Sequence, residues 1–196
     1  MSLHVVATPL GHPEDITLRA IKCLKNSDVI IGEEPKVTRR FLKSIEVPLD
    51  KILLSLNEHS SQKDLLELLE LCKKQNVALI SDCGTPGFCD PGADLIRLCR
   101  QHNIPITSLP GPSSLMLLLS MSSRPLKSFY FAGFLPRKTS ERQKTLQKLS
   151  TLKEPIVLMD TPYRLHKLLD ELSVFKNRSF LIGLQMTQPD ETYIEG

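Results

Sequence analysis

Titratable side chains follow two of the strands that the sequence predicts. Glu33 and Glu34 follow the apolar run 29–31 after a single glycine, and His59 follows the apolar run 52–54. A carboxylate or an imidazole at such a position can accept a proton during a reaction, and the carboxyl ends of the strands in an open α/β sheet are where ligands collect. The alternative for each is an ordinary solvated loop residue. The sequence therefore predicts three candidate catalytic side chains. Whether each one acts as a base depends on the groups that surround it in the folded protein.

The loop formed by residues 81–92 could bind a ligand through its main-chain amides. It follows the apolar run 77–80 and precedes a helical pattern, so the order strand, loop, helix is expected. Its three glycines and two prolines combine positive-φ freedom with local rigidity, which lets main-chain amides approach a ligand closely. Asp90 is the expected N-cap of the following helix, with Pro91 at its first position. The alternative is a tight connection that binds nothing.

Two more loops of small residues and prolines, 8–13 and 110–114, also follow predicted strands. Backbone amides of the second could hold an anionic group. Asp15 is expected to cap a helix that ends near Lys25. The alternation of strands and helices from residue 3 to about residue 121 predicts a parallel sheet with right-handed crossovers. Convergence of its loops would make a site.

A predicted linker at residues 122–125 separates two α/β domains, 1–121 and 126–196. The second opens with the apolar run 129–134 and continues with a polar helix and two further strands. Basic residues in this part predict either a solvated helix face or a patch that contacts phosphate. They are Arg137, Lys138, Arg142, Lys144, Lys148 and Lys153.

Composition narrows the class of protein. The chain has 196 residues, of which 41% are hydrophobic, so it can bury a proper core. Its net charge of +3 does not by itself indicate nucleic acid. Five cysteines without a CxxC pair favour reduced thiols over disulfides or zinc. No signal peptide is recognisable, and the apolar run 115–119 is too short to span a bilayer. We expect a cytoplasmic protein that binds neither metal nor membrane.

Five short motifs, in the same order and at compatible spacing, together resemble the tetrapyrrole methylase superfamily. Within it the chain most resembles the 16S ribosomal RNA 2′-O-ribose cytidine methyltransferases, which use S-adenosylmethionine. The resemblance covers nearly the whole chain, and its motifs lie at residues 8–17, 81–92, 109–113, 133–136 and 161–165.

This resemblance implies a two-domain α/β fold, with an N-terminal parallel sheet flanked by helices and a smaller C-terminal α/β domain. It also implies a homodimer and a cofactor, S-adenosylmethionine, in the cleft between the domains. The residues that it places around the cofactor are Pro9, Ser81, Asp82, Gly84, Thr85, Pro86, Pro110, Gly111, Ser113, Ala132, Gly133, Thr161 and Pro162.

The implied reaction needs few catalytic side chains. Methyl transfer from a sulfonium is an in-line displacement, so the protein mainly positions the acceptor and excludes water. A ribose hydroxyl is a poor nucleophile until its proton is removed. Glu33 and Glu34 are the first candidates for that base, and His59 is the second. Ribosomal RNA or the small ribosomal subunit is the implied partner, with substrate contacts at Lys36, Arg39, Arg40, Arg137 and Lys138.

The sequence departs from the family pattern at His12, at Glu34-Pro35-Lys36 and over residues 183–188. Family members continue beyond the position of Gly196, so a short paralogue or a truncated chain is expected. Two alternatives follow: a methylase of a small tetrapyrrole, and a non-catalytic cofactor-binding paralogue with an interaction or regulatory role. A porphyrinoid would need a broad apolar trough, whereas only 5% of the residues are aromatic and the substrate loop is charged. These features favour RNA.

Overall fold

The computed structural model describes residues 1–89, 91–176 and 178–196. By their contacts these form two units, residues 1–114 with 185–191 and residues 115–184 with 192–196. The division falls earlier in the chain than the expected linker, because α5 (Ser114–Ser120) groups almost entirely with the second unit. The domain boundaries drawn from the sequence stay a prediction.

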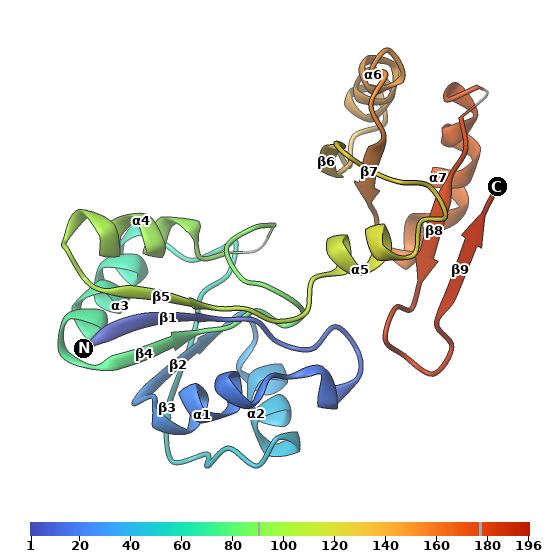
Figure 1. The fold of residues 1–196 in the computed structure, drawn as a ribbon. Helices are drawn as coiled ribbons and strands as arrows, with labels where there is room; N and C mark the ends of the chain where they lie inside the picture. The colour runs from blue at the N-terminus through green and yellow to red at the C-terminus, as the bar shows by residue number, and fades with distance from the viewer. Residues whose placement is uncertain (90, 177) are drawn as a thin grey trace. The chain divides into compact units, whose positions relative to one another are not determined.

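A parallel sheet of five strands forms the centre of the first unit (Figure 1). The strand order is β3-β2-β4-β1-β5, and every pairing is parallel. The predicted parallel sheet is confirmed. Its strands are β1 (Ser2–Val6), β2 (Val29–Gly32), β3 (Ile52–Ser55), β4 (Asn76–Leu79) and β5 (Ile106–Leu109).

Helices cover both faces of this sheet (Figure 1). They are α1 (Leu18–Asn26), α2 (Pro35–Ser44), α3 (Gln62–Lys74) and α4 (Ala93–Gln101). Side chains alternate between the faces of a strand. In β4, Val77 and Leu79 therefore join the core with α3 and α4, and Ala78 joins the core with α1 and α2. Because both faces are buried, the central strands read as nearly continuous apolar runs.

Capping residues set where the helices begin. The Thr17 hydroxyl accepts a hydrogen bond from the Ala20 amide at 3.1 Å, so α1 begins at Leu18. The expected cap at Asp15 is wrong, because this residue lies in a separate 3-10 turn, η1 (Pro13–Asp15). At α3, Ser61 and Asp64 form a capping box, so this helix begins at Gln62.

The start of α4 also differs from the expectation. Its N-cap is Gly92, whose φ of 133° lies outside the helical region, so the helix begins at Ala93. The expected start at Pro91 is therefore wrong. Asp90, the expected cap, lies outside the described residues.

The second unit contains two small sheets. Strands β6 (Tyr130–Phe134) and β7 (Ile156–Met159) pair in parallel, and β8 (Leu181–Leu184) and β9 (Thr192–Glu195) pair antiparallel. Its other elements are α6 (Thr139–Ser150), α7 (Leu165–Glu171) and the 3-10 turns η2 (Pro162–Arg164) and η3 (Leu172–Val174). A small core forms around Leu135, Leu146 and Leu149. Within the described ranges, no helix is long and apolar enough to cross a membrane.

Candidate active site

Hydrogen bonds join the loops that follow β1, β4 and β5, three adjacent strands of the sheet. The Thr8 amide donates to the Gly84 carbonyl at 2.8 Å, and the Gly84 amide donates back at 3.2 Å. The Thr85 hydroxyl donates to the Pro112 carbonyl at 3.3 Å. The loops after β1, β4 and β5, which were expected to bind a ligand, are therefore joined by hydrogen bonds at the carboxyl edge of the sheet.

The strand order explains why a ligand site belongs at this edge. From β1 the chain passes through α1 to β2, while from β4 it passes through α4 to β5 on the other side of β1. Helices α1 and α4 cover opposite faces of the sheet (Figure 1). The chain thus leaves two neighbouring strands in opposite directions, which is the point at which open α/β sheets form a crevice.

Buried contacts hold the loop backbones in place. Thr8 is 2% exposed, and its hydroxyl lies 3.0 Å from the Ser81 carbonyl, to which it donates. A Cβ at Gly111 would lie 2.7 Å from the Cβ of Ala7, so only glycine allows this close approach. Gly84 has a φ of 85°, which L side chains rarely adopt. The sequence motifs included Thr8, but its role in joining two loops depends on the pairing of distant strands.

Three carboxylates gather where β2 and β4 end. The Asp82 amide donates to Glu33 Oε1 at 3.1 Å, and the Glu34 amide donates to the Asp82 carboxylate. Burial raises the pKa of Asp82 and the charge of Glu34 raises it further, while the hydrogen bond from the Glu34 amide opposes both effects. Glu33 and Glu34 therefore lie close to a third acidic residue, Asp82, for which the family resemblance implies a cofactor contact.

His59 and the basic residues of α2 occupy other positions. His59 follows the edge strand β3, and its exposed imidazole lies 3.8 Å from the Glu58 carboxylate. Lys36, Arg39 and Arg40 are exposed on α2, whose buried side carries Thr38 and Leu42.

The remaining site residues lie in the second unit, around β6 and β7. Ala132 and Gly133 are in β6, where the register shifts and Gly133 adopts a φ of 63°. Thr161 and Pro162 follow β7, the parallel partner of β6. Because both strands end at the same side, Arg137 after β6 comes together with Thr161 and Arg164 after β7. These three residues line a pocket of about 350 Å³.

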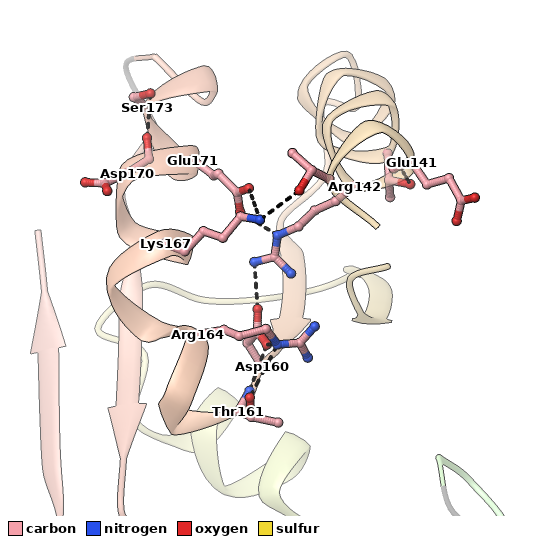
Figure 2. A network of polar contacts seen from close by, with 11 residues as sticks. Glu141, Arg142, Asp160, Thr161, Arg164, Lys167, Asp170, Glu171 and Ser173 are labelled. Carbon is pink, nitrogen blue, oxygen red and sulfur yellow. Dashed lines mark hydrogen bonds and ion pairs between the residues drawn. The ribbon is translucent and has the colours of Figure 1, made fainter. Parts of the chain in front are cut away.

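A buried arginine supports this turn, and it corrects one expectation. Arg142 is only 1% exposed, so it belongs neither to a solvated face nor to a phosphate patch. Its guanidinium lies 2.7 Å from Asp160 and 2.5 Å from Glu171 (Figure 2). Burial lowers the pKa of Arg142, but the hydrogen bonds to Glu171 and Asp160 and the charges of these carboxylates together outweigh burial, so the pKa is raised. Asp160 also accepts from the Thr161 amide at 2.8 Å and pairs with Arg164 at 2.7 Å.

Sequence reasoning missed this cluster, although one signal was present. Arg142, Leu146 and Leu149 are spaced by four and three residues, which places all three on the same side of α6. The side of a helix that carries the core leucines is buried, so an arginine there needs buried carboxylate partners.

Among the described residues, no group of three or more His, Cys, Asp or Glu side chains could hold a metal ion.

Residues 2–196 match the family model described as Tetrapyrrole (Corrin/Porphyrin) Methylases. The chain belongs to this methylase family. It is 39% identical, over 95% of its length, to the Ribosomal RNA small subunit methyltransferase I of Rickettsia prowazekii, and it spans 66% of that relative. It is 37% identical, over 99% of its length, to the protein of the same name from Thermotoga maritima, of which it spans 87%.

A solved structure gives the same answer for the fold. The Uroporphyrin-III C-methyl transferase of Thermus thermophilus, complexed with S-adenyl homocysteine, superposes with a TM-score of 0.67 at 17% identity. The match covers 100% of this chain and 88% of that one. The expected superfamily and its α/β fold are confirmed, and the expected enzyme class, a methyltransferase, is confirmed at the level of the family. The individual site residues stay predictions.

Proposed function

We propose that this chain is an S-adenosylmethionine-dependent methyltransferase that methylates the ribose 2′ hydroxyl of a cytidine in small-subunit ribosomal RNA. The observation that carries the proposal is the fastening of the loops after β1, β4 and β5 at the switch point of the sheet. The names of the relatives at 37% and 39% identity support the RNA substrate. We further propose a homodimer, which the family resemblance implies, and a cytoplasmic location, which the pattern of reduced cysteines favours.

The loops suit S-adenosylmethionine, which supplies an already activated methyl group. Gly84 and Gly111 keep the backbone free of side chains where two loops approach each other, so main-chain groups are available to a ligand. Thr85, Pro110 and Ser113 belong to the same joined loops. The family resemblance also implies cofactor contacts at Ala132, Gly133, Thr161 and Pro162, which belong to the second unit.

Glu34 is the residue that we propose as the general base. The carboxylate of Glu33 already accepts the Asp82 amide, which suits a positioning role between the loops after β2 and β4. Glu34 is exposed, and it is the N-cap of α2 without a hydrogen bond from its side chain to the helix. Its carboxylate is therefore available to a ribose hydroxyl. His59 remains the second candidate.

Glutamine variants test this assignment. We expect Glu34→Gln to lower the rate of methyl transfer by about 10²- to 10⁴-fold, because a positioned base contributes that much. Calorimetry should give an unchanged affinity for S-adenosylhomocysteine. Glu58→Gln, which changes an exposed carboxylate in the loop after β3, is the matched control and should retain the rate, and His59→Gln tests the second candidate. A Glu34→Gln enzyme with the full rate, or a large loss in His59→Gln alone, would show that another group removes the proton.

The tetrapyrrole alternative is supported by the description of the matched family model and by the shared fold with the Thermus thermophilus enzyme. At 17% identity that likeness concerns the fold alone. The exposed basic residues Lys36, Arg39 and Arg40 suit a polyanion better than an apolar macrocycle. Ribosomal RNA therefore stays the preferred substrate.

A further inference from the structure

The pocket between Arg137, Thr161 and Arg164 is built around a fixed guanidinium. Arg164 Nε lies 2.7 Å from Asp160 Oδ1 and 3.3 Å from the Thr161 hydroxyl, which orients the whole planar group. Figure 2 shows its two terminal nitrogens pointing away from Asp160. One of them, Nη1, is buried without a hydrogen-bond partner in the described part of the chain, so a ligand would meet the rest of this side chain, which is 26% exposed. An arginine held in this way is preorganised for an oxyanion.

The charges around the pocket also favour an anion. In the cluster behind it, three cations (Arg142, Arg164 and Lys167) face two carboxylates, Asp160 and Glu171, which leaves one positive charge in excess. Asp160 is 4% exposed and already shared between two arginines. Arg137 adds another positive charge at the pocket and is exposed, with no ion-pair partner among the described residues.

An aromatic side chain stands in the same turn. Tyr163 lies between Thr161 and Arg164 in the chain, within η2, and is 98% exposed. A large aromatic ring this exposed contributes nothing to the core. Next to arginines it has the composition of a surface that binds single-stranded nucleic acid, where rings stack on bases and guanidinium groups hold phosphates.

We propose that Arg137 and Arg164, at the pocket that they line with Thr161, hold a backbone phosphate of a single-stranded RNA segment and that Tyr163 stacks on an adjacent base. This inference rests on the proposed function and adds the substrate contact of the second unit. The buried Arg142 acts through Asp160, as a positioning residue, and the phosphate contact belongs to Arg137 and Arg164.

Fluorescence anisotropy with a labelled single-stranded segment of small-subunit ribosomal RNA tests the proposal on the full chain. Arg137→Gln should lower the slope of log affinity against log salt concentration by about 0.7, the value for one phosphate of a single strand. Tyr163→Ala should weaken binding about 10-fold, because stacking on one base contributes at that level. The matched control is Arg124→Gln, an exposed arginine outside the pocket, which should change neither. Both test residues are exposed, so the fold should survive their replacement.

Calorimetry with S-adenosylhomocysteine separates the possible failures. The inference predicts wild-type cofactor affinity in Arg137→Gln. If Arg137→Gln and Tyr163→Ala bind the RNA as Arg124→Gln does, the pocket is no RNA contact, although the proposed function stands. If Arg137→Gln weakens cofactor binding and leaves the salt slope unchanged, the pocket serves the cofactor and the inference is overturned. If the wild-type chain binds S-adenosylhomocysteine but no RNA, both the inference and the proposed substrate fail.

Discussion

Single side chains in this protein work mainly by holding loops in place. Thr8 fastens the loop after β1 to the loop after β4, and Glu33 fastens the loop after β2 to the same partner. In the second unit, the Asp160 carboxylate forms ion pairs with Arg142 and Arg164 and accepts a hydrogen bond from the Thr161 amide. Apart from the proposed base Glu34, the reacting groups would come from the cofactor and the acceptor, so positioning is the main contribution expected of the protein.

The stability of the second unit should depend on Arg142. Arg142→Met would leave Asp160 and Glu171, which are 4% and 15% exposed, without their central cation. Removing one partner of a buried pair costs about 3–5 kcal/mol, so urea unfolding followed by circular dichroism should show a loss of that size. Lys144→Met, on the exposed side of the same helix, should stay within about 0.5 kcal/mol of wild type. Equal effects of the two substitutions would mean that the buried cluster adds no stability.

At the scale of elements, much of the fold could be predicted from the sequence. Apolar runs that end in loops of glycine, proline and small polar residues marked the five strands of the first sheet. The helix starts were less predictable, because Asp15 competes with Thr17 as a cap and Gly92 prevents an earlier start of α4. The order β3-β2-β4-β1-β5 is set by contacts between distant segments, which single-sequence patterns do not contain.

The same holds for the site. The loops could be predicted because their residue types report on backbone conformation, and Glu33 and Glu34 because they follow a strand. The partnership of Glu33 with Asp82 could not be, since it depends on β2 and β4 being neighbours. The burial of Arg142 could have been inferred from its spacing to Leu146, but its carboxylate partners are Asp160, which directly follows β7, and Glu171 at the end of α7.

Cysteine labelling should report on the loop after β4. Cys83 and Cys89 are exposed there, Cys72 and Cys99 are buried, and burial raises the pKa of the half-buried Cys23. We expect Cys83 and Cys89 to react first with a thiol reagent, and S-adenosylhomocysteine to slow the reaction of Cys83. A Cys89→Ser variant isolates this signal, and Cys23 is the internal control. Labelling of Cys83 at the same rate with and without the cofactor would argue against this loop as a wall of the cofactor pocket.

At the scale of the whole molecule, the two units carry different parts of the proposed reaction. The first supplies the joined loops, the candidate base Glu34 and the basic side of α2. The second supplies the turn at Thr161 and the arginine pocket beside it. Both belong to one methylase family match over residues 2–196. The chain spans 66% of the length of the Rickettsia prowazekii relative and 87% of the length of the Thermotoga maritima relative. The reaction therefore has to be measured on this chain itself.

The central claim is methyl transfer from S-adenosylmethionine to a cytidine ribose of small-subunit ribosomal RNA. The most direct measurement incubates the purified chain with S-adenosylmethionine labelled in its methyl group and with small-subunit RNA that lacks ribose methylation. The label should then be located by nucleotide. The account predicts label in one cytidine as a 2′-O-methyl group, and much slower labelling with Glu34→Gln. Bound S-adenosylhomocysteine without any label in the RNA, or label on a base in place of a ribose, would contradict it.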